Sequence, residues 1–135
     1  MELMIVVAII GLLAAVAIPK YGDLLEKANL GATLGNLAAI RSGVSIYYGS
    51  NMAYPDTIDP QVQTKMAETI STVLPFVKAK YPAANPPYGN SVTIGALTGA
   101  IPSTMGSGWF YCSADGTVFV NSTAIDIKGN PYTIY

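Results

Sequence analysis

Residues 1–18 read MELMIVVAIIGLLAAVAI, an almost unbroken apolar run that Pro19 closes. As a helix these residues span roughly 27 Å, which is close to the hydrocarbon thickness of a bilayer. The run carries one charge, Glu2, at its front edge. A carboxylate costs about 2.5–3.5 kcal/mol at the centre of a membrane and less near an interface, so we expect Glu2 to have a function.

The composition limits what the rest of the chain can be. The chain has 135 residues, which leaves one soluble domain of ordinary size after a membrane segment of about 20 residues. A net charge of −1 with 11% charged residues gives no basic footprint for nucleic acid, so we predict no specific nucleic-acid binding. Histidine is absent, which removes the commonest general base and the commonest metal ligand. We therefore expect no enzyme, no catalytic residues, no cofactor and no metal.

Three interpretations of the apolar run compete. A secretory signal peptide carries a positive front, whereas this front carries Glu2 and no lysine or arginine. A plain single-pass anchor for a binding domain explains the length of the run but gives Glu2 no role. The third interpretation is an anchor that later leaves the bilayer and becomes the core of a protein assembly. The hydrophobic content of 51% favours burial of part of the chain by lipid or by other subunits.

The stretch from Glu2 to Tyr21, ELMIVVAIIGLLAAVAIPKY, resembles the N-terminal signature of mature type IV pilins and related pseudopilins. The resemblance rests on the acidic residue, the Ile/Val/Ala run, the internal Gly11, the closing Ala-Ile-Pro and the aromatic residue two positions later. It implies an α+β type IV pilin fold, in which one long helix over about 1–48 packs on a small antiparallel sheet. Residues 1–21 would form the transmembrane and filament-core helix, and 22–135 the helix continuation and head. Members of this family carry a few residues before the acidic position, so we expect residues upstream of Met1.

The resemblance also implies a function. The chain would be a major pilin, a structural subunit that polymerises through its N-terminal helix into an extracellular type IV pilus filament. Before assembly it would wait in the bacterial inner membrane, and its implied partners are copies of itself, a prepilin peptidase, an assembly platform and an ATPase. The alternatives are the major pseudopilin of a type II secretion system and a single-pass membrane-anchored binding domain. Adhesion, twitching motility and DNA uptake stay open.

Glu2, Gly11 and Pro19 have expected roles in assembly. The resemblance implies that Glu2 pairs with the amine of a neighbouring subunit, and such pairing selects one stagger because an unpaired buried charge is costly. A simpler role is favourable interaction with the helix dipole. Pro19 predicts a kink, and Gly11 lowers helix propensity by about 1 kcal/mol, so the resemblance implies that the segment between them unwinds on assembly. Gly11 could equally permit close helix packing in lipid. The side chains expected to pack in the filament core are Ile5, Val6, Ile9, Ile10, Leu13 and Val16.

Beyond Lys20 the apolar residues recur at steps of three and four as far as about Tyr48, which predicts an amphipathic continuation of the helix. A break near Gly31 is the alternative. Asp59-Pro60 is a typical helix start and predicts a helix over 60–74, whereas the proline-rich residues 81–90 and the segment 101–108 predict irregular structure. Alternation and turn signals predict short strands, with a hairpin at 113–116. These strands are 91–97, 109–112, 117–120, 124–127 and 132–135.

Other candidate sites have weaker signals. Asp56 with Asp59, or Asp115 with Asp126, could supply oxygen ligands to calcium, but single aspartates beside glycine or proline are more typical of turns. Asn121-Ser122-Thr123 matches an acceptor for N-glycosylation.

The only cysteine, Cys112, predicts a small buried side chain in a strand. Since one cysteine cannot close a loop, we expect packing to hold the C-terminal segment in place. The side chains expected to do so are Ile125, Ile127, Tyr132 and Ile134.

Overall fold

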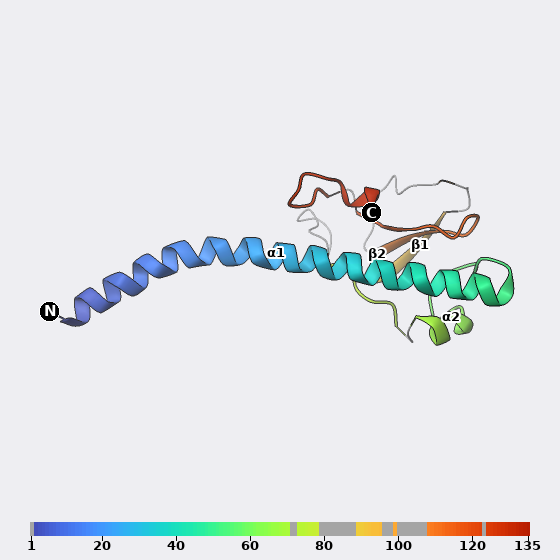
Figure 1. The fold of residues 1–135 in the computed structure, drawn as a ribbon, viewed down its shortest axis with the longest axis horizontal. Helices are drawn as coiled ribbons and strands as arrows, with labels where there is room; N and C mark the ends of the chain where they lie inside the picture. The colour runs from blue at the N-terminus through green and yellow to red at the C-terminus, as the bar shows by residue number, and fades with distance from the viewer. Residues whose placement is uncertain (1, 71–72, 79–88, 96–98, 100–107, 123) are drawn as a thin grey trace.

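The computed structural model describes residues 2–70, 73–78, 89–95, 99, 108–122 and 124–135, and leaves the side chain of Glu2 undescribed. A single helix, α1 (Glu2–Asn51), forms a rod of 50 residues, about 75 Å long. The other described elements pack on its C-terminal half and form a small head, while its N-terminal half extends away from them (Figure 1). The long-helix prediction is therefore confirmed, with an end three residues beyond the predicted Tyr48.

α1 is continuous through every residue that could have interrupted it. Pro19 lies inside the helix, and the helical assignment also continues through Gly31, so the alternative of a break there is wrong. Figure 1 shows α1 curving gently in its N-terminal part. Burial of one stripe of α1 against the head supports the helix in its second half, because tertiary packing stabilises helices more than intrinsic propensity does.

The buried stripe of α1 follows the expected spacing of three and four residues. Gly43 interrupts the row of large side chains, and a Cβ at that position would overlap the side chain of Ile70. This glycine therefore permits a close approach of Ile70 from the chain's own head. The large apolar residues of the stripe are Leu30, Leu37, Ile40, Val44 and Tyr47.

α1 ends in a left-handed residue at the far end of the head. Met52 has a φ of 53°, and its N–H donates to the carbonyl of Tyr48 at 2.8 Å, as is common at helix C-termini. The reversed chain places the ring of Tyr54 on that of Tyr48, with centroids 4.6 Å apart. The Tyr111 hydroxyl then donates to the carbonyl of Pro55 at 2.7 Å, which ties this turn to the sheet.

The sheet has three strands, β1 (Ser91–Gly95), β2 (Gly108–Cys112) and β3 (Val118–Val120), in the order β1-β2-β3. β2 lies in the centre and all five of its residues are buried. β2 and β3 are antiparallel, but β1 and β2 are parallel, so the prediction of a purely antiparallel sheet is wrong. Twelve residues separate β1 from β2 in the sequence, which is the length that a parallel connection requires.

The predicted hairpin is confirmed. The N–H of Gly116 donates to the carbonyl of Cys112 at 2.9 Å, and Gly116 has a φ of 73°, which favours glycine. The Asp115 carboxylate accepts hydrogen bonds from the N–H and hydroxyl of Thr117. Asp115 therefore acts as a turn former, which is the simpler of its two predicted roles.

Two predicted elements are shorter or different. The helix predicted over 60–74 is α2 (Thr64–Thr69), because Asp59 accepts from Gln61 in a separate turn and does not cap α2. The last two predicted strands are replaced by one bridge between Ile125 and Pro131 and by the 3₁₀ helix η1 (Tyr132–Ile134). The predictions for 79–88, 96–98 and 100–107 lie outside the described residues.

Gly108 provides a test of the sheet register. Its φ is 115°, and a Cβ there would overlap the main chain of Ser91, whereas Gly129 has a φ of 83° and open space. We expect Gly129→Ala to cost about 1–2 kcal/mol and Gly108→Ala about 3 kcal/mol or more. Urea unfolding of the full chain in detergent micelles measures both. Equal losses would contradict the close pairing of β1 with β2.

Candidate assembly interface

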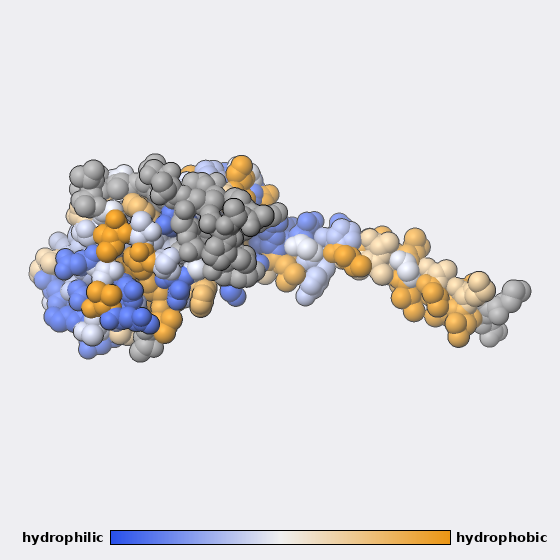
Figure 2. All heavy atoms as spheres, turned by 180° about the vertical axis from the view of Figure 1, so that it is seen from behind, coloured by the Kyte–Doolittle hydropathy of each residue, from blue (hydrophilic) through white to orange (hydrophobic). Residues whose placement is uncertain are grey.

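The N-terminal part of α1, residues 3–19, forms an exposed apolar stalk. Its large apolar side chains between Leu3 and Ile18 are 53–78% exposed, and they lie on every side of the helix. Figure 2 shows the stalk as a nearly continuous apolar surface that leaves a mixed polar head. The most hydropathic window of α1 has a mean hydropathy of 2.5, none of it is buried, and it is long and apolar enough to cross a membrane.

Exposure on this scale is costly in water. Burial of one large aliphatic side chain contributes about 1.5–3 kcal/mol, so covering the eleven in the stalk is worth on the order of 20 kcal/mol. That exceeds the usual stability of a whole domain, about 5–15 kcal/mol. A helix that is apolar all round is buried in a protein core or spans a membrane. The stalk is thus the surface at which this molecule must be covered by lipid or by other polypeptide.

The structure does not single out the residues predicted to pack in a filament core. The predicted six are 53–64% exposed, but five further large apolar residues of the stalk are 60–78% exposed. These five belong to the same apolar run as the predicted six. The predicted six are Ile5, Val6, Ile9, Ile10, Leu13 and Val16. The five others are Leu3, Met4, Val7, Leu12 and Ile18.

The other predicted assembly residues also lie in α1. Glu2 is the first described residue of α1, at the end farthest from the head. A Cβ on Gly11 would meet no atom within 4 Å, so nothing within this chain requires a glycine there. Gly11 and Pro19 both stand in uninterrupted helix, and their predicted unwinding concerns a state other than this one.

The stalk joins the head at a short charged segment. Lys20, Asp23, Glu26 and Lys27 follow Pro19, and Leu30 is the first fully packed residue of α1. A hollow of about 340 Å³ at this junction is lined by Asp23, Glu26 and Lys27 and by Ile127 from the C-terminal segment. The uninterrupted apolar surface therefore ends at Pro19, directly before the first of these charges.

Asp126 organises the C-terminal segment of the head. Its carboxylate accepts hydrogen bonds from the hydroxyl of Tyr135 at 2.6 Å and from the N–H groups of Lys128 and Asn130 at 2.7 and 2.9 Å. We call these four residues the C-terminal clasp. The Tyr135 hydroxyl, with those N–H groups, holds the pKa of Asp126 below its usual value. The sequence suggested Asp126 as a possible calcium ligand with Asp115. In the structure its carboxylate instead accepts these three hydrogen bonds from the C-terminal segment.

Arg41 connects the C-terminal segment to α1 and the sheet. Its Nε and Nη2 donate to the carbonyl of Val118 in β3 at 3.1 and 2.8 Å, and Nη2 also donates to the main-chain oxygen of Tyr135. The clasp and Arg41 therefore hold the segment by polar contacts. Tyr132 is buried as predicted, but Ile125 and Ile134 are about 60% exposed and Ile127 is 38% exposed. Packing of these three isoleucines is not what holds the segment, which corrects that prediction.

Two further predicted residues are buried in the head. Cys112 is fully buried in β2, as predicted. Asn121, the candidate glycosylation acceptor, is 2% exposed, and its amide nitrogen donates to the Thr93 hydroxyl at 2.9 Å. A sugar on that nitrogen would displace both the burial and the hydrogen bond, so the folded head disfavours this site. Within the described ranges, no three His, Cys, Asp or Glu side chains gather where they could hold a metal ion.

The chain is similar in sequence to several known proteins. The chain is 32% identical over 108 residues to fimbrial protein EcpC of Eikenella corrodens, which covers 78% of this chain and 60% of that protein. It is 51% identical over 43 residues to the type IV major alpha-pilin of Moraxella bovis, covering 32% of this chain and 27% of the relative. It is 36% identical over 56 residues to the type II secretion system core protein G of Pseudomonas aeruginosa, covering 42% and 39%.

The chain spans 60% or less of the length of each of these relatives. No protein-family model and no solved structure matches the chain.

The clasp predicts how the head responds to acid. Because its hydrogen bonds lower the pKa of Asp126 in the folded state, their contribution is complete above the unfolded pKa of about 4 and is lost as pH falls below it. We expect Asp126→Asn to lower the melting temperature at pH 7 and to reduce its further fall between pH 5 and pH 3. Circular dichroism of the full chain in micelles measures this.

Glu68→Gln is the matched control, because Glu68 is exposed on α2. It should leave the melting temperature at pH 7 unchanged. If Asp126→Asn behaves like this control, the clasp does not stabilise the head.

Proposed function

The chain belongs to the type IV pilin-like family, and from this premise we propose that it is a major pilin that polymerises through α1 into an extracellular type IV pilus. The exposed apolar stalk is the observation that carries the proposal. A subunit with such a stalk needs two successive surroundings, a bilayer before assembly and the stalks of other copies afterwards. The proposed role is structural and not catalytic.

The first surrounding is the bacterial inner membrane. The residues from Leu3 to Pro19 would cover roughly 25 Å as a helix, enough for most of the hydrocarbon core. Lys20 and Tyr21 follow at once, and lysine and tyrosine are typical of the membrane–water interface. Tyr21 is 65% exposed and so available for that interface. The head would then stand outside the hydrocarbon with its own core intact.

The second surrounding is a helical filament. Stalks that pack side by side would bury the same eleven side chains that lipid covered. Transfer from lipid to protein gains little hydrophobic free energy, so polar interactions and close packing must select the filament geometry. The transfer would require the partners implied by the family: a prepilin peptidase, an assembly platform and an ATPase.

We propose that the charge of Glu2 selects the filament geometry. It stands at the membrane end of α1, where its unpaired charge is unfavourable in an apolar filament core. Pairing with the amine of a neighbouring copy removes this penalty at one stagger only. The segment from Gly11 to Pro19 would unwind when the stalks assemble, because glycine lowers helix propensity and proline removes a helical hydrogen bond.

The similarity to a type II secretion core protein supports one alternative to the major pilin, namely the major pseudopilin of a secretion system. Both candidates would polymerise through the apolar stalk, but a pilus extends from the cell surface whereas a pseudopilus stays within the cell envelope. Electron microscopy of fibres sheared from the cell surface, with mass spectrometry of their protein, distinguishes them. We expect long surface fibres made of this chain. Fibres confined to the cell envelope would favour the pseudopilin, and a strictly monomeric membrane protein would exclude both.

Replacement of Glu2 tests the proposed registration. We expect Glu2→Gln to leave the chain in the membrane at a normal level but to reduce sheared fibres at least tenfold. Asp23→Asn is the control, since it removes a carboxylate just beyond the apolar run. Membrane fractionation and fibre yield are measured for both variants. Normal fibres from Glu2→Gln would refute charge pairing without refuting polymerisation through α1.

A further inference from the structure

We propose that the loop of residues 124–131 docks on the phospholipid surface while the stalk lies in the bilayer, so that the head of the unassembled subunit rests on the membrane. We call these residues the docking loop. The inference depends on the membrane-inserted state of the proposed function and adds an interaction surface to it. Its partner is the headgroup layer of the membrane.

The position of the docking loop is the first support. Figure 1 shows this loop beside α1 at the side of the head from which the stalk leaves. Ile127 lines the hollow with Asp23, Glu26 and Lys27, which lie four to eight residues beyond Pro19, or about 6–12 Å along the helix. The polar layer of a bilayer is about 5–8 Å thick on each side, and spanning helices tilt by about 20° on average. A modest tilt toward the loop therefore brings its side chains to the headgroups.

The exposed side chains of the loop suit such a surface. Ile125 is 61% exposed and Ile127 is 38% exposed, while Asp126 between them is turned inward and is 5% exposed. Lys128 follows directly and is exposed. Apolar groups next to a long cationic side chain are typical of segments that lie in a membrane interface, with the hydrocarbon part inserted and the ammonium at the phosphates.

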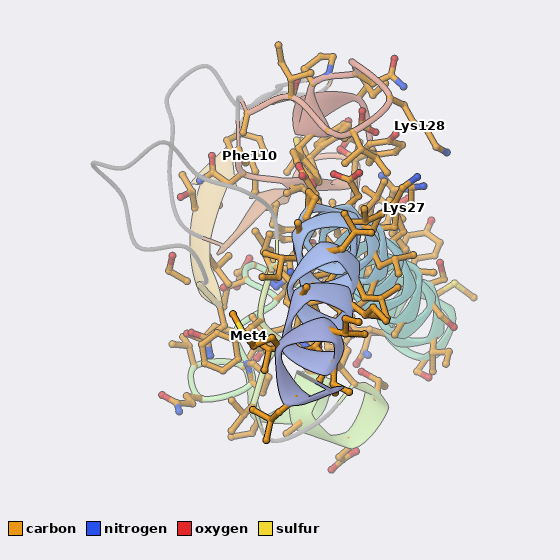
Figure 3. All side chains as sticks on the ribbon, turned by 90° about the vertical axis from the view of Figure 1, so that its left-hand side faces the viewer. Met4, Lys27, Phe110 and Lys128 are labelled. Atoms are coloured by element: carbon orange, nitrogen blue, oxygen red, sulfur yellow. The ribbon has the colours of Figure 1, made fainter. Side chains whose placement is uncertain are left out.

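The lysines at the junction support a preference for anionic lipid. Figure 3, which looks from the stalk toward the head, shows Lys27 and Lys128 extending to the same side of the molecule. Lys20 is seven residues before Lys27 and so lies on the same face of α1. Asp23, Glu26 and Asp126 carry an equal number of negative charges, but the Asp126 carboxylate is buried and is turned to its three hydrogen-bond donors. The lysine side chains are the longer ones and reach farther toward the phosphates.

The clasp keeps the loop in this arrangement. Asp126 accepts from Lys128 and Asn130 within the loop, and the Asp126 N–H donates to the carbonyl of Asn130 at 2.8 Å. The two isoleucines flank this fixed point and are exposed in the folded single chain. Their exposure is therefore available before any filament forms.

The test uses the full chain in vesicles of phosphatidylcholine and phosphatidylglycerol that contain a lipid with a gadolinium-chelating headgroup. Isoleucine methyl groups are labelled with carbon-13, and their paramagnetic broadening is measured by NMR. We expect broadening of Ile125 and Ile127 but not of Ile46, which is 53% exposed about 40 Å beyond Pro19 along α1. Ile18 in the stalk should be broadened whenever α1 is inserted.

A charge reversal supplies the matched pair of variants. Lys128→Glu should reduce the broadening of Ile125 and Ile127 several-fold in these vesicles. Lys65→Glu, at the far end of the head where Lys65 donates to Asn51, should not change it. Equal effects of the two variants would overturn the proposed contact of Lys128 with anionic headgroups.

The outcomes separate this inference from the function it rests on. Broadened Ile18 with unaffected Ile125 and Ile127 would overturn loop docking and leave membrane insertion intact. Unaffected Ile18 would show that α1 is not inserted, which overturns both. Signal changes at Ile125 and Ile127 that follow the protein concentration, and not the gadolinium lipid, would identify a second copy as the occupant and overturn the lipid assignment.

Discussion

The uncovered apolar surface of the stalk is the constraint on which the rest of the molecule depends. Covering its side chains with lipid or protein is worth on the order of 20 kcal/mol, and none of the head residues that the structure describes covers them. The head can be small because it packs on the other half of the same helix. One continuous α1 thus connects the surroundings of the stalk to the head.

The helix and its division into stalk and head could be read from the sequence, because both follow from long local patterns. A run of eighteen residues in which only Glu2 is not apolar, followed by a stripe at steps of three and four, indicates one long helix. The hairpin was equally predictable, since Asp115 and Gly116 have turn chemistry that acts over four residues. Buried Cys112 and Tyr132 follow from their apolar character.

The errors arose where the partner of a residue lies far away in the sequence. Alternation in β1 indicates a strand but not its direction, and only pairing with β2 makes it parallel. Asp59-Pro60 forms a turn instead of a helix start because α2 begins later, where Met66 can be buried. The roles of Asp126 and Arg41 were missed for the same reason, since their acceptors and donors are set by tertiary contacts with Tyr135 and Val118. No local signal predicts those contacts.

The clasp has a consequence for the conditions under which the head can fold. A polar network centred on one carboxylate, with Arg41 reaching across from α1, fixes the segment that ends at Tyr135. The sequence has a single cysteine, and it is buried in β2, so no sulfur chemistry within the chain takes part. The fold of the head should therefore be indifferent to the redox state of its compartment and independent of oxidative folding catalysts.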